Sequence, residues 1–235
     1  MKASASTAEA ASSRLAGHTR LHGSLLARPE RVALAWMATR LPDWVNSDHL
    51  TALGLASMAG VGASFWLARA APRVGLPLVV ACLFLNWLGD SLDGTVARVR
   101  NRQRPRYGFY VDHVVDIAGT SMMLAGIAAS GYIHPLLAMA TLVAWLLAAA
   151  ESFLATNARS VFRLSFLWVG PTELRILVAV AALSLLAGGV VSVPGLGMCR
   201  LLDVIGVAAS AGLAAAFIVN VIRNVIALYR EETRW

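Results

Sequence analysis

The segment VGLPLVVACLFLNWLGDSLDGTVAR, residues 74–98, decides the fold because it is a long apolar stretch that ends in two carboxylates. About 20 consecutive apolar residues allow an α-helix to cross the hydrocarbon core of a membrane, and this segment is long enough. Asp90 and Asp93 are costly at membrane depth, so they indicate a functional site. The segment therefore predicts a transmembrane helix with acidic chemistry at one end.

The rest of the chain repeats this apolar pattern. Of its 235 residues, 58% are hydrophobic and 14% are charged, and the mean hydropathy is +0.66. These values are typical of integral membrane proteins. In lipid, backbone groups must be hydrogen-bonded within helices or closed barrels, and the stretches are too long for barrel strands. We therefore expect an all-α membrane protein with six transmembrane helices, at residues 49–68, 74–97, 108–130, 134–156, 174–194 and 200–228.

The basic residues predict how these helices are oriented. A net charge of +7 alone is compatible with nucleic-acid binding. With six spans, however, all Lys and Arg residues except Arg69, Arg73 and Arg200 fall on one side of the membrane. Such a bias marks the cytoplasmic side, and basic residues there attract anionic lipid headgroups. We therefore expect both termini and the aspartates to face the cytoplasm, and we expect no nucleic-acid partner.

The N-terminal region differs in composition from the apolar domain. Residues 1–23, rich in Ala and Ser, predict a disordered tail. Residues 24–46 predict an amphipathic helix at the membrane interface. The six-helix domain would then cover 47–230, with Ser47 or Asp48 capping its first helix, and 231–235 would form a cytoplasmic tail.

Four aspartates are spaced so that they share two helix faces. Asp90 and Asp93 are three residues apart, and Asp112 and Asp116 are four apart, so each pair lies on one face of its helix. The link between the two helices is short, so the helices must be antiparallel neighbours and their carboxylates can converge. Carboxylates brought together repel one another unless cations neutralise them. All-oxygen ligands suit Mg²⁺, Mn²⁺ or Ca²⁺.

Residues beside the first aspartate pair suit a phosphate-containing ligand. Gly94 would let a phosphate approach the backbone closely, and Arg98 can bind phosphate through its planar guanidinium. Either aspartate pair alone would fit a structural ion pair or a helix cap. A membrane transporter with an acidic cation site is an alternative, but it leaves Gly94, Ala97 and Arg98 unexplained.

The pattern Asp-x2-Asp-Gly-x2-Ala-Arg, followed by Gly-x3-Asp-x3-Asp, resembles the signature of the CDP-alcohol phosphotransferase family. In this chain it comprises Asp90, Asp93, Gly94, Ala97, Arg98, Gly108, Asp112 and Asp116. The link from Arg98 to Gly108 is one residue longer than usual, which we interpret as an insertion in a cytoplasmic loop. The six predicted helices also resemble the family's six-helix domain.

This resemblance implies a phospholipid-synthesis enzyme that transfers a substituted phosphate group from a CDP-linked donor to an alcohol, with release of CMP. It also implies a homodimer and two divalent cations, Mg²⁺ or Mn²⁺, held by Asp90, Asp93, Asp112 and Asp116. Asp116 would be the base that takes the acceptor's proton. The nucleotide would be bound by Asp93, Gly94, Ala97, Arg98 and Gly108.

Composition and single residues give the expectations for the donor and the acceptor. The Arg- and Ala-rich composition fits a bacterial inner-membrane protein and favours CDP-diacylglycerol as donor. His113, directly after Asp112, resembles the branch that uses CDP-choline or CDP-ethanolamine with diacylglycerol, or it hydrogen-bonds a ligand carboxylate. Arg159 and Arg175 are expected on the cytoplasmic side and are candidates for acceptor binding, the alternative being membrane anchoring.

A membrane prenyltransferase is the nearest rival enzyme, because it also uses aspartates and Mg²⁺ to activate a diphosphate. Its first motif usually has a further aspartate at the position that Ala97 occupies here. The residue pattern therefore favours the phosphotransferase.

Overall fold

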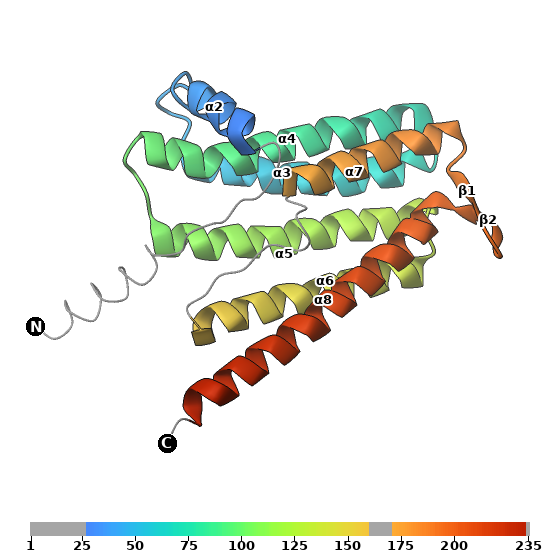
Figure 1. Cartoon of the computed structure of the whole chain (residues 1–235). Coiled ribbons are helices and arrows are strands. Elements are labelled where there is room, and N and C mark those ends of the chain that lie inside the picture. The colour runs from blue at the N-terminus through green and yellow to red at the C-terminus, as the bar shows by residue number, and fades with distance from the viewer. Residues whose placement is uncertain (1–26, 160–170, 234–235) are drawn as a thin grey trace, which may run out of the picture.

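The computed structural model describes residues 27–159 and 171–233, and these residues are almost entirely helical (Figure 1). Five of the helices are long and apolar enough to cross a membrane, which confirms the prediction of an all-α, multi-pass membrane protein. The predicted tail 1–23 lies outside the described residues. The helices are α2 (Ala27–Ala38), α3 (Ser47–Ala68), α4 (Pro72–Val99), α5 (Pro105–Ser130), α6 (Pro135–Arg159), α7 (Pro171–Ser184) and α8 (Leu201–Glu232).

The fifth predicted span, 174–194, is shorter in the structure than the sequence predicts. Helix α7 has 14 residues and continues for only one 3₁₀ turn, η1 (Leu185–Ala187). Gly188 and Gly189 follow, with positive φ values of 118° and 61°. A right-handed helix needs a negative φ, so the helix ends here. Glycine suits both positions because residues with a side chain rarely adopt a positive φ. The chain then forms an antiparallel hairpin of β1 (Val190–Val193) and β2 (Gly197–Arg200), with its turn at Pro194–Leu196.

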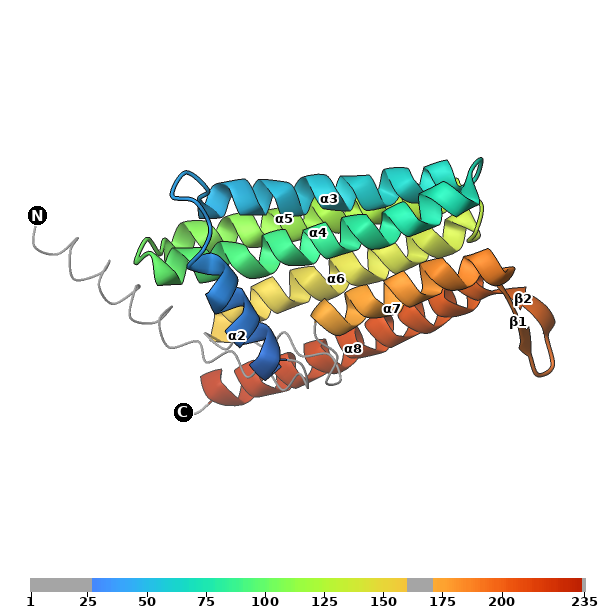
Figure 2. The same ribbon diagram turned by 90° about the horizontal axis from the view of Figure 1, so that it is seen from above.

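Helices α3, α4 and α5 lie side by side in the bundle (Figures 1 and 2). Their backbones approach closely at glycines, as is usual for helices packed in membranes. A Cβ atom added to Gly89 on α4 would lie 2.6 Å from the carbonyl oxygen of Leu50 on α3. A Cβ added to Gly126 on α5 would overlap the backbone of Gly62 on α3. Any larger residue at Gly89 or Gly126 would therefore push α3 away from its neighbours.

The remaining helices are arranged around this group. Helix α7 packs against α4, and α8 packs mainly against α6. Both views show that α7 begins part-way along the bundle and not at its end (Figures 1 and 2). The first residues of α7 therefore reach the middle of α4, at the depth of its aspartates.

The start of α3 is capped one residue before the predicted positions. Asn46, and not Ser47 or Asp48, is the N-cap residue: its side chain accepts a hydrogen bond from the backbone N–H of His49 at 2.9 Å. The Nδ1 atom of His49 in return accepts from the backbone N–H of Asn46 at 3.4 Å. Such a reciprocal pair satisfies two backbone donors that helix formation leaves free.

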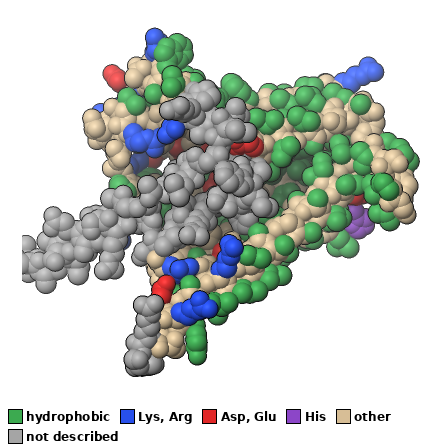
Figure 3. Space-filling model, in the orientation of Figure 1, with side chains coloured by type: hydrophobic (Ala, Val, Ile, Leu, Met, Phe, Trp, Pro, Cys, Tyr) green, Lys and Arg blue, Asp and Glu red, His purple; other side chains and the backbone are tan. Residues whose placement is uncertain are grey.

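Hydrophobic side chains are spread along the visible surface of the helices, and many large ones are exposed (Figure 3). Lys and Arg side chains lie mostly toward the end of the bundle that carries the α4–α5 link and the C-terminus. An apolar surface along the helices with basic residues at one end is typical of a protein embedded in a bilayer.

Candidate active site

The four motif aspartates lie on two antiparallel helices that follow one another in the chain. Asp90 and Asp93 are on α4, and Asp112 and Asp116 are on α5. The carboxylates are near enough for their charges to repel one another: Asp116 interacts with the other three, and Asp93 interacts with Asp90 and Asp112. Asp116 is the exposed member of the set, while the others are half-buried.

The side chain of Asp93 is held by α3. The hydroxyl of Thr51 donates to Asp93 Oδ2 at 2.7 Å and also lies 3.0 Å from the backbone carbonyl of Ser47. Because Thr51 has these two contacts, its hydroxyl is fixed and orients the carboxylate. The sequence motif does not include Thr51, and only its position one turn after the helix start distinguishes it.

The side chain of Asp90 is paired with Arg175 from α7. A terminal guanidinium nitrogen of Arg175 lies 2.5 Å from Asp90 Oδ2, and its Nε donates to Asn86 Oδ1 at 2.8 Å. Asn86 Nδ2 in turn donates to the backbone carbonyl of Gly54 on α3 at 3.0 Å. Three helices therefore meet at Asp90. Arg175, which the sequence predicts to bind the acceptor, belongs to this site.

Arg159, the other predicted acceptor residue, lies in a different group of side chains. Its guanidinium donates to Asn224 on α8 at 2.8 Å and pairs with Glu231 at 3.5 Å. Asn224 also donates to Glu151 at 2.6 Å. Within the described residues, none of these contacts reaches a motif aspartate, so Arg159 and Arg175 do not share one site.

The predicted nucleotide residues lie at the end of α4 and the start of α5. Arg98 folds back along its own helix, where its guanidinium donates to the hydroxyl of Thr95 at 3.0 Å. A Cβ added to Gly94 would lie 3.3 Å from the same guanidinium, so Arg98 covers Gly94. Gly108 has open space around its Cα position.

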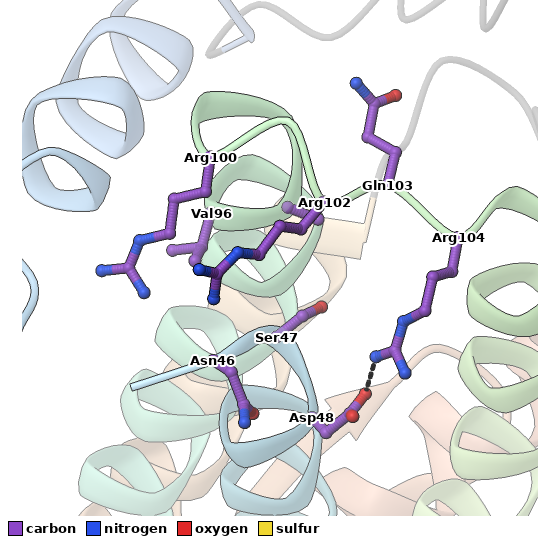
Figure 4. Close-up of a pocket in the computed structure, with 9 residues that line it drawn as sticks. Asn46, Ser47, Asp48, Val96, Arg100, Arg102, Gln103 and Arg104 are labelled. Atoms are coloured by element: carbon purple, nitrogen blue, oxygen red, sulfur yellow. Dashed lines mark hydrogen bonds and ion pairs between the residues drawn. The ribbon is translucent and has the colours of Figure 1, made fainter. Parts of the chain in front are cut away.

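A cavity of about 390 Å³ lies next to Ala97, between the start of α3 and the α4–α5 link (Figure 4). Arg104 pairs with Asp48 across it at 2.5 Å, and Arg100 donates to the backbone carbonyls of Leu41 and Pro42 at 2.8 and 3.0 Å. These bonds fix the link against α3. The lining residues are Asn46, Ser47, Asp48, Val96, Ala97, Arg100, Arg102, Gln103 and Arg104.

His113 is buried beside the second aspartate pair. Its ring packs against Phe109 and Phe153, with centroids 4.1 and 4.6 Å away, and its Nδ1 lies 2.6 Å from the backbone carbonyl of Phe109. The packing holds the ring against the start of α5.

The donor chemistry at the site fits a divalent cation, because carboxylate oxygens are the hard ligands that Mg²⁺ and Mn²⁺ prefer. Carboxylates that repel one another also gain from a cation between them. Across residues 27–159 and 171–233, however, no three His, Cys, Asp or Glu side chains lie close enough together to hold a metal ion. The residues present fit a divalent cation by the type of ligand that they offer.

Together these features define a class: multi-pass helical membrane proteins with interacting carboxylates on two antiparallel helices. The family model described as CDP-alcohol phosphatidyltransferase matches residues 45–222. Because the match runs from the start of α3 into α8 and covers most of the chain, the protein belongs to the CDP-alcohol phosphatidyltransferase family. No curated protein matches the chain.

Membership in this family defines the general reaction. The protein is a membrane transferase that acts on a CDP-alcohol donor and an alcohol acceptor. Family members generally use divalent cations.

Proposed function

We propose that the protein is a phospholipid-synthesis enzyme that transfers the phosphatidyl group of CDP-diacylglycerol to an alcohol and releases CMP. The observation that carries this proposal is the set of four aspartates on α4 and α5, whose charges interact within an apolar helical bundle. A diacyl donor also suits the largely hydrophobic surface of the bundle, because its acyl chains would remain in the bilayer.

In this reaction the acceptor's hydroxyl oxygen forms a bond with the phosphorus that carries the lipid. The bond from this phosphorus to the oxygen bridging it to CMP breaks, and CMP leaves with both electrons. Two divalent cations, Mg²⁺ or Mn²⁺, held by Asp90, Asp93, Asp112 and Asp116, would neutralise the diphosphate and the leaving group. We assign Asp116 as the base that accepts the hydroxyl proton, and its exposure is consistent with access to the acceptor.

We propose that the nucleotide half of the donor binds near the end of α4. Asp93, Gly94, Ala97, Arg98 and Gly108 are the proposed contacts, and the cavity beside Ala97 supports this position. Several arginines line this cavity, so it offers a favourable environment for an anionic ligand.

For the acceptor, Arg175 has the stronger support because it contacts Asp90 directly. Its guanidinium would help to bind and orient the acceptor or its anionic group. Arg159 remains a candidate for headgroup contact at the end of α6.

The proposed setting is a bacterial inner membrane, with both termini and the site on the cytoplasmic side. The basic residues gathered at the site end of the bundle support this orientation. A homodimer is part of the proposal, and α8 leaves much apolar surface for a second copy because only Leu202 and Gly206 are buried along it.

The test is CMP release by the purified protein in lipid, with Mg²⁺ or Mn²⁺ and with a chelator as the control. CDP-diacylglycerol with a panel of alcohols should release CMP only when the cation is present. Asp116→Asn should abolish this release while the thermal unfolding midpoint stays near that of the wild type. Full CMP release by Asp116→Asn would refute the assigned base.

A second candidate function is a choline- or ethanolamine-type transfer to diacylglycerol, favoured by His113 directly after Asp112. The same assay with CDP-choline or CDP-ethanolamine and diacylglycerol separates the two. CMP release with these donors, and none with CDP-diacylglycerol, would replace the first proposal with the second.

A further inference from the structure

Asn86 is a buried polar side chain on α4 that the sequence motif does not include. It is only 7% exposed and lies one helical turn before Asp90. Burying an amide is costly unless its donor and acceptor are both hydrogen-bonded. Both polar groups of the Asn86 amide are hydrogen-bonded: its oxygen accepts from Arg175, and its nitrogen donates to the backbone carbonyl of Gly54.

The chemistry of the two partners fixes the orientation of the amide. Arginine can only donate hydrogen bonds, and a backbone carbonyl can only accept them. The Asn86 oxygen must therefore face Arg175 and its nitrogen must face Gly54. The contact of α3 and α4 at Gly54 and Gly89 holds this amide against a rigid backbone.

The bond from Asn86 also fixes the guanidinium of Arg175. With Nε bound to Asn86 and a terminal nitrogen bound to Asp90, two points of the planar group are held. The side chain of Arg175 is 17% exposed, so little of it is free to move into solvent. Arg175 comes from α7, which begins part-way along the bundle, and Asn86 and Asp90 on α4 together bind its guanidinium.

We propose that Asn86 is a positioning residue for the transfer reaction: it holds the guanidinium of Arg175 in one orientation beside Asp90, and thereby sets how well the acceptor is bound. This inference rests on the proposed function. The hydrogen bonds of Asn86 join it to Arg175 and to the backbone of Gly54, so it acts on the reaction through Arg175.

The first experiment is a double-mutant cycle with Asn86→Ala, Arg175→Ala and the double variant in lipid, assayed for CMP release. Residues that act through one another give non-additive losses. We expect Asn86→Ala to raise the acceptor KM about tenfold with a smaller change in kcat, and the double variant to be no worse than Arg175→Ala. Losses that multiply in the double variant, or an unchanged KM in Asn86→Ala, would overturn the proposal.

The matched control is Thr141→Val, which removes a polar bridge between α6 and α8. The Thr141 hydroxyl lies 2.8 Å from that of Ser210, outside the site. We expect its kinetics to match those of the wild type. If Asn86→Ala merely lowers the folded fraction, its thermal unfolding midpoint falls while turnover per folded molecule stays constant, which would also overturn the proposal.

A second measurement does not depend on activity. An arginine-selective dicarbonyl reagent, followed by mass spectrometry, should label Arg175 several times faster in Asn86→Ala than in the wild type or Thr141→Val. Unchanged labelling would show that Asn86 does not restrain Arg175. Absence of CMP release from the wild type with every substrate pair would instead refute the proposed function, so the two failures are distinguishable.

Discussion

Two groups of side chains in the described part of the chain combine an arginine, an asparagine and a carboxylate, and they differ in where they lie. One links Arg175, Asn86 and Asp90 between α7 and α4. The other links Arg159, Asn224 and Glu151 between α6 and α8. We call them the α4–α7 triad and the α6–α8 triad. Only the α4–α7 triad contains a motif aspartate.

The packing around the two triads also differs. The α4–α7 triad is braced by α3, whose backbone touches α4 at Gly54 and Gly89. The α6–α8 triad joins α6 to a helix with little buried surface, and Arg159 also pairs with Glu231 near the end of α8. The same polar groups can therefore serve a rigid chemical site in one place and join two helices in another.

The largest expected difference comes from removing the carboxylate of each triad. Asp90→Asn should lower CMP release at least about 100-fold, because it removes a proposed cation ligand. Glu151→Gln should change it less than about threefold. Turnover of the two purified variants at saturating Mg²⁺ measures this, and comparable losses would show that the triads are not functionally distinct.

Removing the arginine of each triad should give a smaller contrast in the same direction. Arg175→Ala is expected to lower kcat/KM about 10- to 100-fold, because a charge-assisted contact to a substrate or carboxylate contributes about 1.5–3 kcal/mol. Arg159→Ala should lower it less than about threefold. Steady-state kinetics with varied acceptor tests this, and a larger loss in Arg159→Ala would move the acceptor site to the end of α6.

The sequence predicts much of this comparison correctly, and what it misses has physical reasons. Hydropathy locates the long helices, and the spacing of Asp90 and Asp93 predicts their shared face. The pairing of Arg175 with Asp90 joins residues far apart in the chain and depends on how deep α7 begins. Hydropathy does not show where along the bundle α7 begins, because any apolar stretch of this length is predicted to be a transmembrane helix.

The hairpin after α7 is a second place where hydropathy alone does not predict the structure, because an apolar strand and a continued helix give the same signal. Val190–Val193 is apolar and extends the hydropathy signal of α7, although it forms a strand. The signal that distinguishes the two is Gly188-Gly189, which interrupts the helix before the β-branched residues begin. Asn86 gives no comparable signal, since a lone Asn in an apolar run fits several kinds of interhelical hydrogen bond.

A third prediction concerns the orientation of Asp93 by Thr51. Thr51→Val keeps the shape of the side chain and removes the hydroxyl that donates to Asp93. Loss of a group that orients a metal ligand typically lowers metal affinity or activity 10- to 100-fold, and we expect the lower end because Asp93 keeps its own position on α4. A Mg²⁺ titration of CMP release should show a roughly tenfold higher half-saturating concentration.

The matched change on the other side of the comparison is Thr141→Val, which breaks a similar hydroxyl contact between α6 and α8. It should leave the Mg²⁺ titration unchanged. A shift of equal size in both variants would mean that bundle packing, and not the orientation of Asp93, controls the cation dependence.

The smallest expected effect is on stability. It is tested by substituting one glycine near each triad, Gly89 on α4 and Gly212 on α8. A methyl group at Gly89 would meet the carbonyl of Leu50 at 2.6 Å, so Gly89→Ala must separate α3 from α4 and should destabilise the fold by about 1–3 kcal/mol. Gly212 on α8 has no atom near its Cβ position, so Gly212→Ala should be neutral or stabilising by up to about 1 kcal/mol. Thermal unfolding in one detergent measures both. A lower midpoint for Gly212→Ala would show that α8 is packed against a further surface, because a methyl group exposed to lipid or detergent costs nothing in packing.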